Sequence, residues 1–281
     1  MRALGVYRET EFSPGKVTHD AAILDAVLGE LERHEVEVAA ISAARLVDDP
    51  PAGADLVLAM CQGERALGRL AALERQGATA VNSALAIRNC YRDLLCAGLV
   101  HAGVPVPPGA LVRTGARPPD LSPLGVLDLD APMFVKRGDL HALASDDVQR
   151  VESRGALRSA LAGMARRGVP VAYVQQAVEG RVVKFYGVSG GEYFAALDAE
   201  GARGGQDSMS DRVRLELARS AAAAAATLGL EAWGGDAVID GERFTMIDFN
   251  DWPSFSRVRE AAARAIARRC LMLARRLRRS L

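Results

Sequence analysis

Residues 234–250 read GGDAVIDGERFTMIDFN, two apolar runs joined by a short polar connection that contains glycine. A connection of this length between β-prone runs predicts a β-hairpin, with strands over Asp236–Ile239 and Phe244–Phe249. Side chains alternate between the two faces of a strand, so Asp248 and Asn250 point the same way. The segment therefore predicts a hairpin that presents polar side chains on one face.

The pairing register of this hairpin decides which side chains face each other. A three-residue loop, Gly241–Arg243, places Asp236 directly opposite Asp248. A two-residue turn at Asp240-Gly241 moves the pair out of register. Two carboxylates that face each other across antiparallel strands repel unless a cation lies between them. Because oxygen ligands alone suit Mg²⁺, we expect a magnesium site formed by Asp236, Asp248 and Asn250.

Lysine is rare in this chain, which otherwise uses arginine as its basic residue: it occurs at Lys16, Lys136 and Lys184. The two side chains are not equivalent where a compact ammonium is needed, for example against a phosphate, so the three lysines are candidates for chemistry. Lys136 ends a strand-like run in MFVKRGDLH, residues 133–141, and a turn with Gly138 follows. Such a turn can hold a phosphate through backbone N–H groups and the ammonium. Neither this segment nor the one around Lys16 is a Walker A loop.

A third segment, YVQQAVEGRVVKF at residues 173–185, predicts two strands separated by a short break at Glu179-Gly180. The second of these strands carries Lys184 inward.

The N-terminal hundred residues alternate between strand and helix patterns. Strands separated by helices of this length predict a parallel sheet with helices on both faces. The pattern stops at VPVPPG, residues 104–109, a rigid connector that ends the preceding helix and marks a domain boundary. The expected strands are Ala3–Tyr7, Val36–Ile41, Asp55–Cys61 and Ala78–Asn82, and the expected helices are His19–Arg33, Glu64–Arg75 and Ala84–His101.

The rest of the chain predicts an α+β arrangement of antiparallel strands with helices over one face. Besides the hairpin, the expected strands are Met133–Lys136, Val171–Val178, Val182–Val188 and Tyr193–Leu197, and the expected helices are Ala156–Arg167, Asp211–Leu228 and Arg257–Leu281.

Composition excludes several classes of protein. The 281 residues are 49% hydrophobic and 25% charged with no net charge, as in an ordinary globular protein. The longest apolar stretch, Ala221–Leu230, is far too short to span a membrane, and no leader sequence stands out. The four cysteines form no C-x-x-C pair, so we expect neither a zinc site nor disulfides, and a cytoplasmic location. The arginine-rich terminal helix is expected to bind a lobe through its leucines rather than a membrane or nucleic acid.

The order and spacing of the three segments resemble the ATP-grasp superfamily over nearly the whole chain. The family's strand with a phosphate-binding lysine resembles Val135-Lys136, its hinge resembles Gln175–Val178, and its metal motif resembles Asp236 with Asp248-x-Asn250. The resemblance implies an N-terminal parallel α/β domain over residues 1–104. A two-lobed ATP-grasp domain would follow, with its lobes at 105–178 and 179–281.

The resemblance also implies roles for individual residues. ATP would lie between the two lobes, its phosphates bridged by one or two Mg²⁺ ions, with Mn²⁺ as a substitute. Lys184 would reach the γ-phosphate or the acceptor, and Arg92 stands where the family has a second phosphate-binding lysine. The remaining implied contacts are adenine with Gln175, Gln176, Ala177 and Val178; phosphates with Lys136, Gly138 and His141; and metal with Asp236, Asp248 and Asn250.

The activity that this resemblance implies is that of an ADP-forming carboxylate–amine or carboxylate–thiol ligase. The γ-phosphate would move to a carboxylate, and the nucleophile would displace phosphate from the acyl phosphate. Asp248 stands where most peptide-forming members carry Glu, and Asp-x-Asn is more like the inositol trisphosphate kinase branch. A small-molecule kinase for polyols or inositol phosphates is therefore an alternative. A further alternative is a nucleotide-binding regulator without turnover, because Arg92 stands in place of the family's lysine.

The acceptor is expected to be a small anionic molecule, and the sequence indicates no general base. Candidate positions for reading the acceptor's charge are Lys16, His19 and Asp20 in the first loop, with Arg203 and Arg212 in the second lobe. A homodimer is an expectation on general grounds alone.

Overall fold

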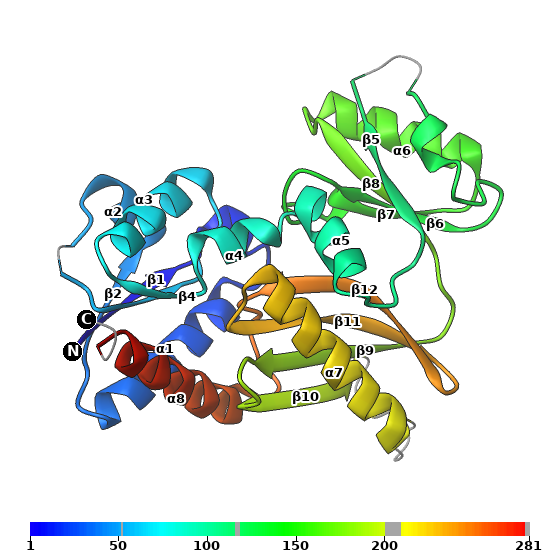
Figure 1. The fold of residues 1–281 in the computed structure, drawn as a ribbon. Coiled ribbons are helices and arrows are strands. Elements are labelled where there is room, and N and C mark those ends of the chain that lie inside the picture. Colours follow the sequence, from blue (N-terminus) through cyan, green and yellow to red (C-terminus); the bar gives the residue numbers. More distant parts are fainter. Residues whose placement is uncertain (52, 116–118, 200–208, 279–281) are drawn as a thin grey trace.

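The computed structural model describes residues 1–51, 53–115, 119–199 and 209–278, with side chains described to residue 275. It contains three four-stranded sheets, one in the N-terminal region and one in each of the two lobes. Figure 1 shows the first lobe standing apart from the other two regions, which lie side by side. No helix in the part of the chain that is described is both long and apolar enough to cross a bilayer.

The N-terminal sheet is parallel throughout, which confirms the predicted α/β pattern. Its order is β2-β1-β3-β4. Leu56 and Leu58 face the core beneath α1 and the C-terminal helix α8 (Arg259–Arg278), whereas Val57 and Ala59 face α2 and α3. A strand buried on both faces reads as a continuous apolar run, as this one does. The elements are β1 (Arg2–Tyr7), α1 (Val17–Arg33), β2 (Glu37–Ser42), α2 (Ala43–Asp48), β3 (Leu56–Ala59), α3 (Glu64–Arg75) and β4 (Thr79–Val81).

The single helix expected over Ala84–His101 is wrong. The structure has two helices, α4 (Ala84–Asn89) and α5 (Arg92–His101), because the backbone of Tyr91 is extended. The Tyr91 side chain is fully buried beside the N-terminal core. The break places Arg92 in the first turn of a new helix, where its side chain reaches between the two lobes.

The first lobe is an antiparallel sheet in the order β5-β8-β6-β7, covered by α6 (Arg154–Arg166). Two of its strands were missed in the sequence. One, β5, begins at Gly109, the last residue of the proline-rich connector. The other, β7, follows a short 3-10 turn over Ser145–Asp147. The strands are β5 (Gly109–Arg113), β6 (Met133–Arg137), β7 (Val148–Val151) and β8 (Val171–Gln176).

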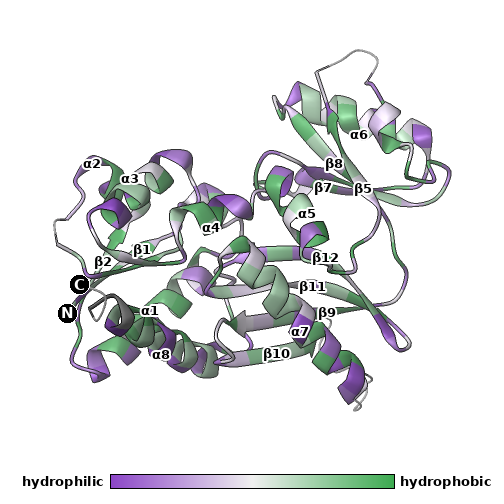
Figure 2. Ribbon diagram, viewed as in Figure 1, coloured by the Kyte–Doolittle hydropathy of each residue, from purple (hydrophilic) through white to green (hydrophobic). Residues whose placement is uncertain are grey.

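The second lobe is an antiparallel sheet in the order β10-β9-β11-β12, with α7 (Asp211–Leu228) packed on it. The bounds predicted for α7 are confirmed: Ser210 caps its first turn, and Gly229 ends it with a φ of 78°. Figure 2 shows hydrophobic and hydrophilic residues alternating along α1, α6 and α7, as expected of helices that cover a sheet. The strands are β9 (Arg181–Val188), β10 (Tyr193–Asp198), β11 (Ala232–Asp240) and β12 (Arg243–Asp251).

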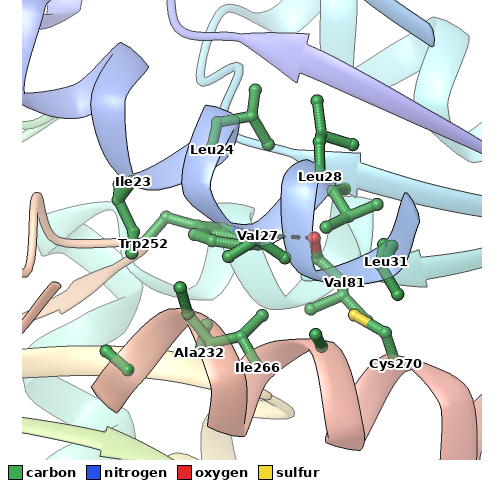
Figure 3. Close-up of a cluster of buried hydrophobic side chains, with 14 of the residues drawn as sticks. Ile23, Leu24, Val27, Leu28, Leu31, Val81, Ala232, Trp252, Ile266 and Cys270 are labelled. Atoms are coloured by element: carbon green, nitrogen blue, oxygen red, sulfur yellow. Dashed lines mark hydrogen bonds between the residues drawn. The ribbon is translucent and has the colours of Figure 1, made fainter. Parts of the chain in front are cut away.

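The N-terminal region and the second lobe share one hydrophobic core. The last helix, α8 (Arg259–Arg278), leaves the second lobe and packs against α1 beneath the N-terminal sheet. Figure 3 shows Trp252 in this core, and its indole N–H donates to the carbonyl of Val81 at 2.9 Å. Asn82 strengthens the joint, since its side chain bonds the backbone of Glu231 and Ala232. The N-terminal region and the second lobe, joined by this core, thus form one side of the cleft between the lobes.

Candidate active site

The β11–β12 hairpin places Asp236 opposite Asp248, as expected, but not through the expected loop. Asp240 pairs with Arg243, so the turn has two residues rather than three. A bulge between Asp236 and Ala237 corrects the register, because Ile247 on β12 has no partner of its own. The observed turn is therefore neither of the two considered from the sequence, and the bulge is what brings the two carboxylates together.

The polar face of the hairpin lines a cleft of about 470 Å³ between the N-terminal region and the two lobes. Asp236, Asp248 and Asn250 all border it, together with Lys184 from the neighbouring strand. The Lys184 ammonium lies 2.8 Å from an Asp236 carboxylate oxygen. Burial lowers the pKa of Lys184, but the Asp236 carboxylate outweighs burial, so the net pKa is raised. Lys184 is thus a firmly charged group beside the paired carboxylates.

Arg92 and Lys136 join the first lobe to this hairpin. Arg92 donates to the carbonyl of Arg137 at 2.9 Å and lies 3.5 Å from the Asp248 carboxylate. Lys136 donates to the carbonyl of Ile247, the bulged residue, at 2.9 Å. Burial lowers the pKa of the Lys136 ammonium. The two predicted phosphate ligands therefore lie side by side, and both contact the metal-motif strand.

The pKa of Asp248 is lowered even though burial acts to raise it. The charges of Arg92 and Lys136 outweigh burial, so the carboxylate stays ionised. Two carboxylates and the amide of Asn250 thus face the cleft as oxygen donors, a set that fits Mg²⁺ in its chemistry. This set includes an amide. Among the described residues, no three or more His, Cys, Asp or Glu side chains lie together in a way that could hold a metal ion.

The hinge residues lie at the end of β8, where the first lobe returns to the second. Gln175 is buried and borders a cavity of about 20 Å³ with Lys136 and Asp248, room for about one water molecule. The backbone N–H groups of Gln176 and Ala177 donate to the carbonyls of Pro108 and Pro132. The Gln176 side chain also binds the Pro132 carbonyl. Within the described residues Val178 N–H makes no backbone hydrogen bond, so it is the hinge N–H that is left for a ligand.

Gly138 serves a packing role that the sequence did not indicate. Its N–H donates to the carbonyl of Val171 at 2.8 Å, so it does not point to the cleft. An added Cβ would lie 2.9 Å from that same carbonyl oxygen. The expectation that this N–H cradles a phosphate is not supported by the geometry, because a neighbouring strand already takes the hydrogen bond.

His141 lies in the cleft, but its partner is a residue the sequence analysis missed. Its Nε2 lies 3.4 Å from a carboxylate oxygen of Asp251, which is 1% exposed. Gln62 and Arg8 complete this cluster: Gln62 donates to Asp251 at 2.8 Å, and Arg8 donates to the carbonyl of Trp252 at 2.8 Å. Arg8 directly follows β1 and Gln62 lies three residues after the end of β3, and ligands often bind at the carboxyl ends of parallel strands. That position was the signal available in the sequence.

The residues expected to read the acceptor divide into two groups. Lys16, His19 and Asp20 border the cleft as expected. Arg212 does not: it is exposed at the start of α7 and bonds Glu242 at the tip of the hairpin. Arg203 lies outside the described residues. The structure therefore places the first loop at the cleft and Arg212 elsewhere.

Comparison with known proteins gives a clear result for the fold alone. No protein-family model matches the chain, and no curated protein matches it. Among solved structures, D-alanine–D-alanine ligase from Bacillus anthracis complexed with ATP has a TM-score of 0.76 at 12% identity, covering 100% of this chain and 99% of its own. A RimK domain ATP-grasp protein from Sphaerobacter thermophilus has a TM-score of 0.69 at 18% identity, covering 96% and 100%. D-cycloserine synthetase DcsG has a TM-score of 0.69 at 20% identity, covering 99% and 100%.

Proposed function

This chain has the ATP-grasp fold, and from that premise we propose that it is an ADP-forming, Mg-ATP-dependent ligase that joins a carboxylate to an amine or thiol. The observation that carries the proposal is one constellation at the cleft. Lys184, Arg92 and Lys136 converge on the hairpin that bears the two facing carboxylates. Three cations beside an oxygen-donor set suit a polyphosphate and its metal ion.

Phosphoryl transfer needs mainly positioning and charge neutralisation, which these residues supply. Bound Mg²⁺ would contribute charge stabilisation at the phosphates, held by Asp236, Asp248 and Asn250. Arg92 borders the cleft and Lys136 borders the small cavity beside it, and both would bind phosphate oxygens in place of their present backbone partners. Lys184 holds its proton firmly and so acts as a fixed positive charge. Val178 N–H and the hinge carbonyls would orient the adenine.

The cavity bordered by the hinge holds about one water molecule, which is too small for a nucleobase. A nucleobase seated in this cavity would therefore require the first lobe to move away from the hairpin. The contacts that would yield are the ones made by Arg92 and Lys136 with backbone carbonyls. These bonds join side chains to single carbonyls, so a phosphate can replace them without unfolding a strand.

The acceptor we propose is a small anionic molecule. Lys16 borders the cleft and its charge acts on Asp236, so it lies near the metal set. The paired charges of the cleft neutralise one another, with Arg8 bound to Asp20 at 3.2 Å and Lys184 bound to Asp236. Lys16 has no ion pair within the described residues, and is therefore available for an acceptor carboxylate.

A small-molecule kinase is the second candidate, and Asp248 is the observation that favours it. Its shorter side chain replaces the Glu of most peptide-forming relatives, as in the inositol trisphosphate kinase branch. The products separate the two reactions: a ligase releases free phosphate, whereas a kinase leaves the phosphate on its product.

The first experiment is a thermal-shift titration with ATP at fixed Mg²⁺. Wild type should be stabilised by roughly 2.7 kcal/mol at a hundred times the dissociation constant. The Asp248→Ala/Asn250→Ala double variant should lose this shift, whereas His34→Gln, on the exposed end of α1, should keep it. Absence of a shift in wild type at millimolar Mg-ATP would contradict the proposal. ADP and free phosphate are then measured with the common amino acids and D-alanine as candidate substrates.

A further inference from the structure

A histidine–aspartate pair lies at the inner wall of the cleft, and its histidine is one of the residues that the sequence resemblance implies as phosphate contacts. The pair is His141, on the loop after β6, and Asp251, the last residue of β12. Nε2 of His141 is 3.4 Å from Oδ1 of Asp251. The His141 side chain is 13% exposed and borders the cleft, whereas the Asp251 side chain is fully enclosed. A basic side chain that reaches the cleft is therefore backed by a buried carboxylate.

The surroundings of this pair fix the imidazole tautomer. Gln62 donates to Oδ1 of Asp251 at 2.8 Å, and an Arg8 nitrogen lies 3.8 Å from Oδ2. The carboxylate therefore has a hydrogen-bond donor and a counter-charge besides His141. Nε2 is buried with the carboxylate as its nearest acceptor, so a lone pair at that nitrogen would face negative charge. In neutral His141 the proton must then sit on Nε2, and Nδ1 carries the free lone pair.

Packing holds the ring in that orientation. Tyr91 meets the His141 ring edge to face, with ring centres 6.2 Å apart and planes at 81°. The Tyr91 hydroxyl in turn donates to the carbonyl of Gln62. Nδ1 of His141 has no hydrogen-bond partner within the described residues, and the side chain borders the cleft. Nδ1 is thus the nitrogen that a ligand in the cleft can meet.

The other candidate bases of the cleft are occupied. Lys184 is a charged ammonium bound to Asp236. Asp20 accepts a hydrogen bond from Ser13 at 2.7 Å and pairs with Arg8. His19 is exposed, and its Nδ1 lies 3.5 Å from a guanidinium nitrogen of Arg259. His141 is the one of these groups that combines a free basic nitrogen with a fixed orientation.

We propose that His141 is the general base for the attacking nucleophile, and that Asp251 is the residue that positions it. The proposal rests on the ligase function proposed above. The lone pair of the attacking amine forms the new C–N bond to the acyl carbon, and the C–O bond to phosphate breaks. Phosphate leaves with that electron pair, and the N–H proton passes to Nδ1 of His141. At 3.4 Å the His141–Asp251 contact is not a hydrogen bond in this structure; catalytic hydrogen bonds are often long without substrate and tighten when it binds.

The tautomer can be tested without a substrate, by imidazole ¹⁵N NMR of the wild-type protein. The chain has four histidines, and the spectrum of His141→Gln assigns the signal. We expect His141 to carry its proton on Nε2. In Asp251→Asn the neutral amide no longer fixes this tautomer, and a population with the proton on Nδ1 should appear. A wild-type spectrum with the proton on Nδ1 overturns the proposal, whether or not the variants fold.

The catalytic step is tested by comparing two nucleophiles at pH 7, with ATP, Mg²⁺ and the mixture of common amino acids and D-alanine. Hydroxylamine is largely unprotonated at this pH and attacks acyl phosphates without a base. His141→Gln and Asp251→Asn should lose about 10²–10⁴-fold of the amine-dependent rate, and keep hydroxylamine-dependent ADP release. His34→Gln should keep both rates.

The outcomes separate this proposal from the proposed function. An unchanged amine-dependent rate in His141→Gln overturns the role of His141, as does an equal loss with both nucleophiles, which signals a structural effect. Absence of ADP release by wild type with either nucleophile counts against the ligase function. In that case the imidazole spectrum still decides whether the dyad has the tautomer that a base requires.

Discussion

Asp147 shows how one buried carboxylate can hold a loop of the first lobe. It accepts hydrogen bonds from the backbone N–H groups of Leu143 and Ala144 at 2.9 and 3.1 Å, and from Arg167 at 2.9 Å. Burial raises the pKa of Asp147, but these hydrogen bonds outweigh burial, so the net pKa is lowered. Because His141 lies on the same loop, Asp147 supports the proposed base through the backbone.

Replacing Asp147 with Asn should reduce the free energy of unfolding by about 2–4 kcal/mol at pH 7, since charge-assisted bonds to buried donors are lost. A carboxyl whose pKa is lowered on folding stabilises the protein above its unfolded pKa, and that contribution is lost as pH falls through the folded pKa. The gap between wild type and variant should therefore shrink in acid. Urea unfolding at pH 7 and near pH 3 measures this. Asp146→Asn, which alters an exposed neighbour, should show little change at either pH; an equal loss there would contradict the assignment.

Arg92 gives a second prediction at this scale. It is 6% exposed and lies against Asp248, so Arg92→Ala leaves a largely enclosed carboxylate without its nearest cation. Breaking a buried pair from one side costs about 3–5 kcal/mol, and we expect a loss near the lower figure because the cleft admits water. Millimolar Mg²⁺ without ATP should restore part of the stability of the variant, more than it stabilises wild type. Thermal unfolding with and without Mg²⁺ tests this; a variant indifferent to Mg²⁺ would place the metal elsewhere.

At the scale of elements, the turn after β6 depends on close contact with β8. Gly138→Ala would place a Cβ 2.9 Å from the Val171 carbonyl oxygen and 3.0 Å from the carbonyl carbon of Ala172. These are backbone atoms, so the clash can be relieved only by a backbone shift. We expect a loss of about 1–3 kcal/mol, as for other overpacked sites. Gly163→Ala, in the interior of α6 in the same lobe, meets nothing closer than 3.8 Å and should stabilise by about 0.5–1 kcal/mol. Opposite signs in urea unfolding confirm the assignment, whereas a neutral Gly138→Ala would show that the turn is free to shift.

Elements with local signals could be predicted from the sequence. Helix α7 is bounded by the Ser210 cap and the Gly229 stop, both visible as residue types, and its limits are confirmed. The break between α4 and α5 was missed because Cys90 and Tyr91 are apolar and continue the helical pattern. The strand β5 was missed because three prolines dominate the segment before it.

The candidate site, too, could be predicted only in part from local sequence signals. The facing of Asp236 and Asp248 was predicted, but the bulge that produces it was not, since it depends on contacts outside the hairpin. One of these is the bond from Lys136 in the other lobe to the carbonyl of Ile247. The dyad of His141 and Asp251 joins two distant segments through tertiary contact alone, so no spacing in the sequence indicates it.

At the scale of the whole molecule, the joint between the N-terminal region and the second lobe fixes one wall of the cleft. Asn82 is fully buried there, and its side chain satisfies the carbonyl and N–H of Ala232 and the N–H of Glu231. The hydrophobic core beneath it combines residues from β1, β3, β4, α1 and α8 with Trp252. Arg8 and Gln62 reach Asp251 across this same joint. The proposed base is thus held by a contact between segments far apart in the chain.

Asn82→Ala should therefore weaken the whole molecule rather than one region. It leaves the N–H groups of Glu231 and Ala232 without partners, whereas the Ala232 carbonyl keeps the Trp252 N–H, so we expect a loss of about 2–4 kcal/mol. Asn89→Ala, which removes a single bond to the Leu228 carbonyl at 3.1 Å, should cost about 1 kcal/mol. Because the core is shared, both regions should still unfold together, so near-UV and far-UV circular dichroism should give coincident transitions in urea. Separate unfolding transitions in Asn82→Ala would mean that the two regions are independent domains. In that case Asn82, rather than the shared core, would hold the cleft wall and the position of Asp251 behind His141.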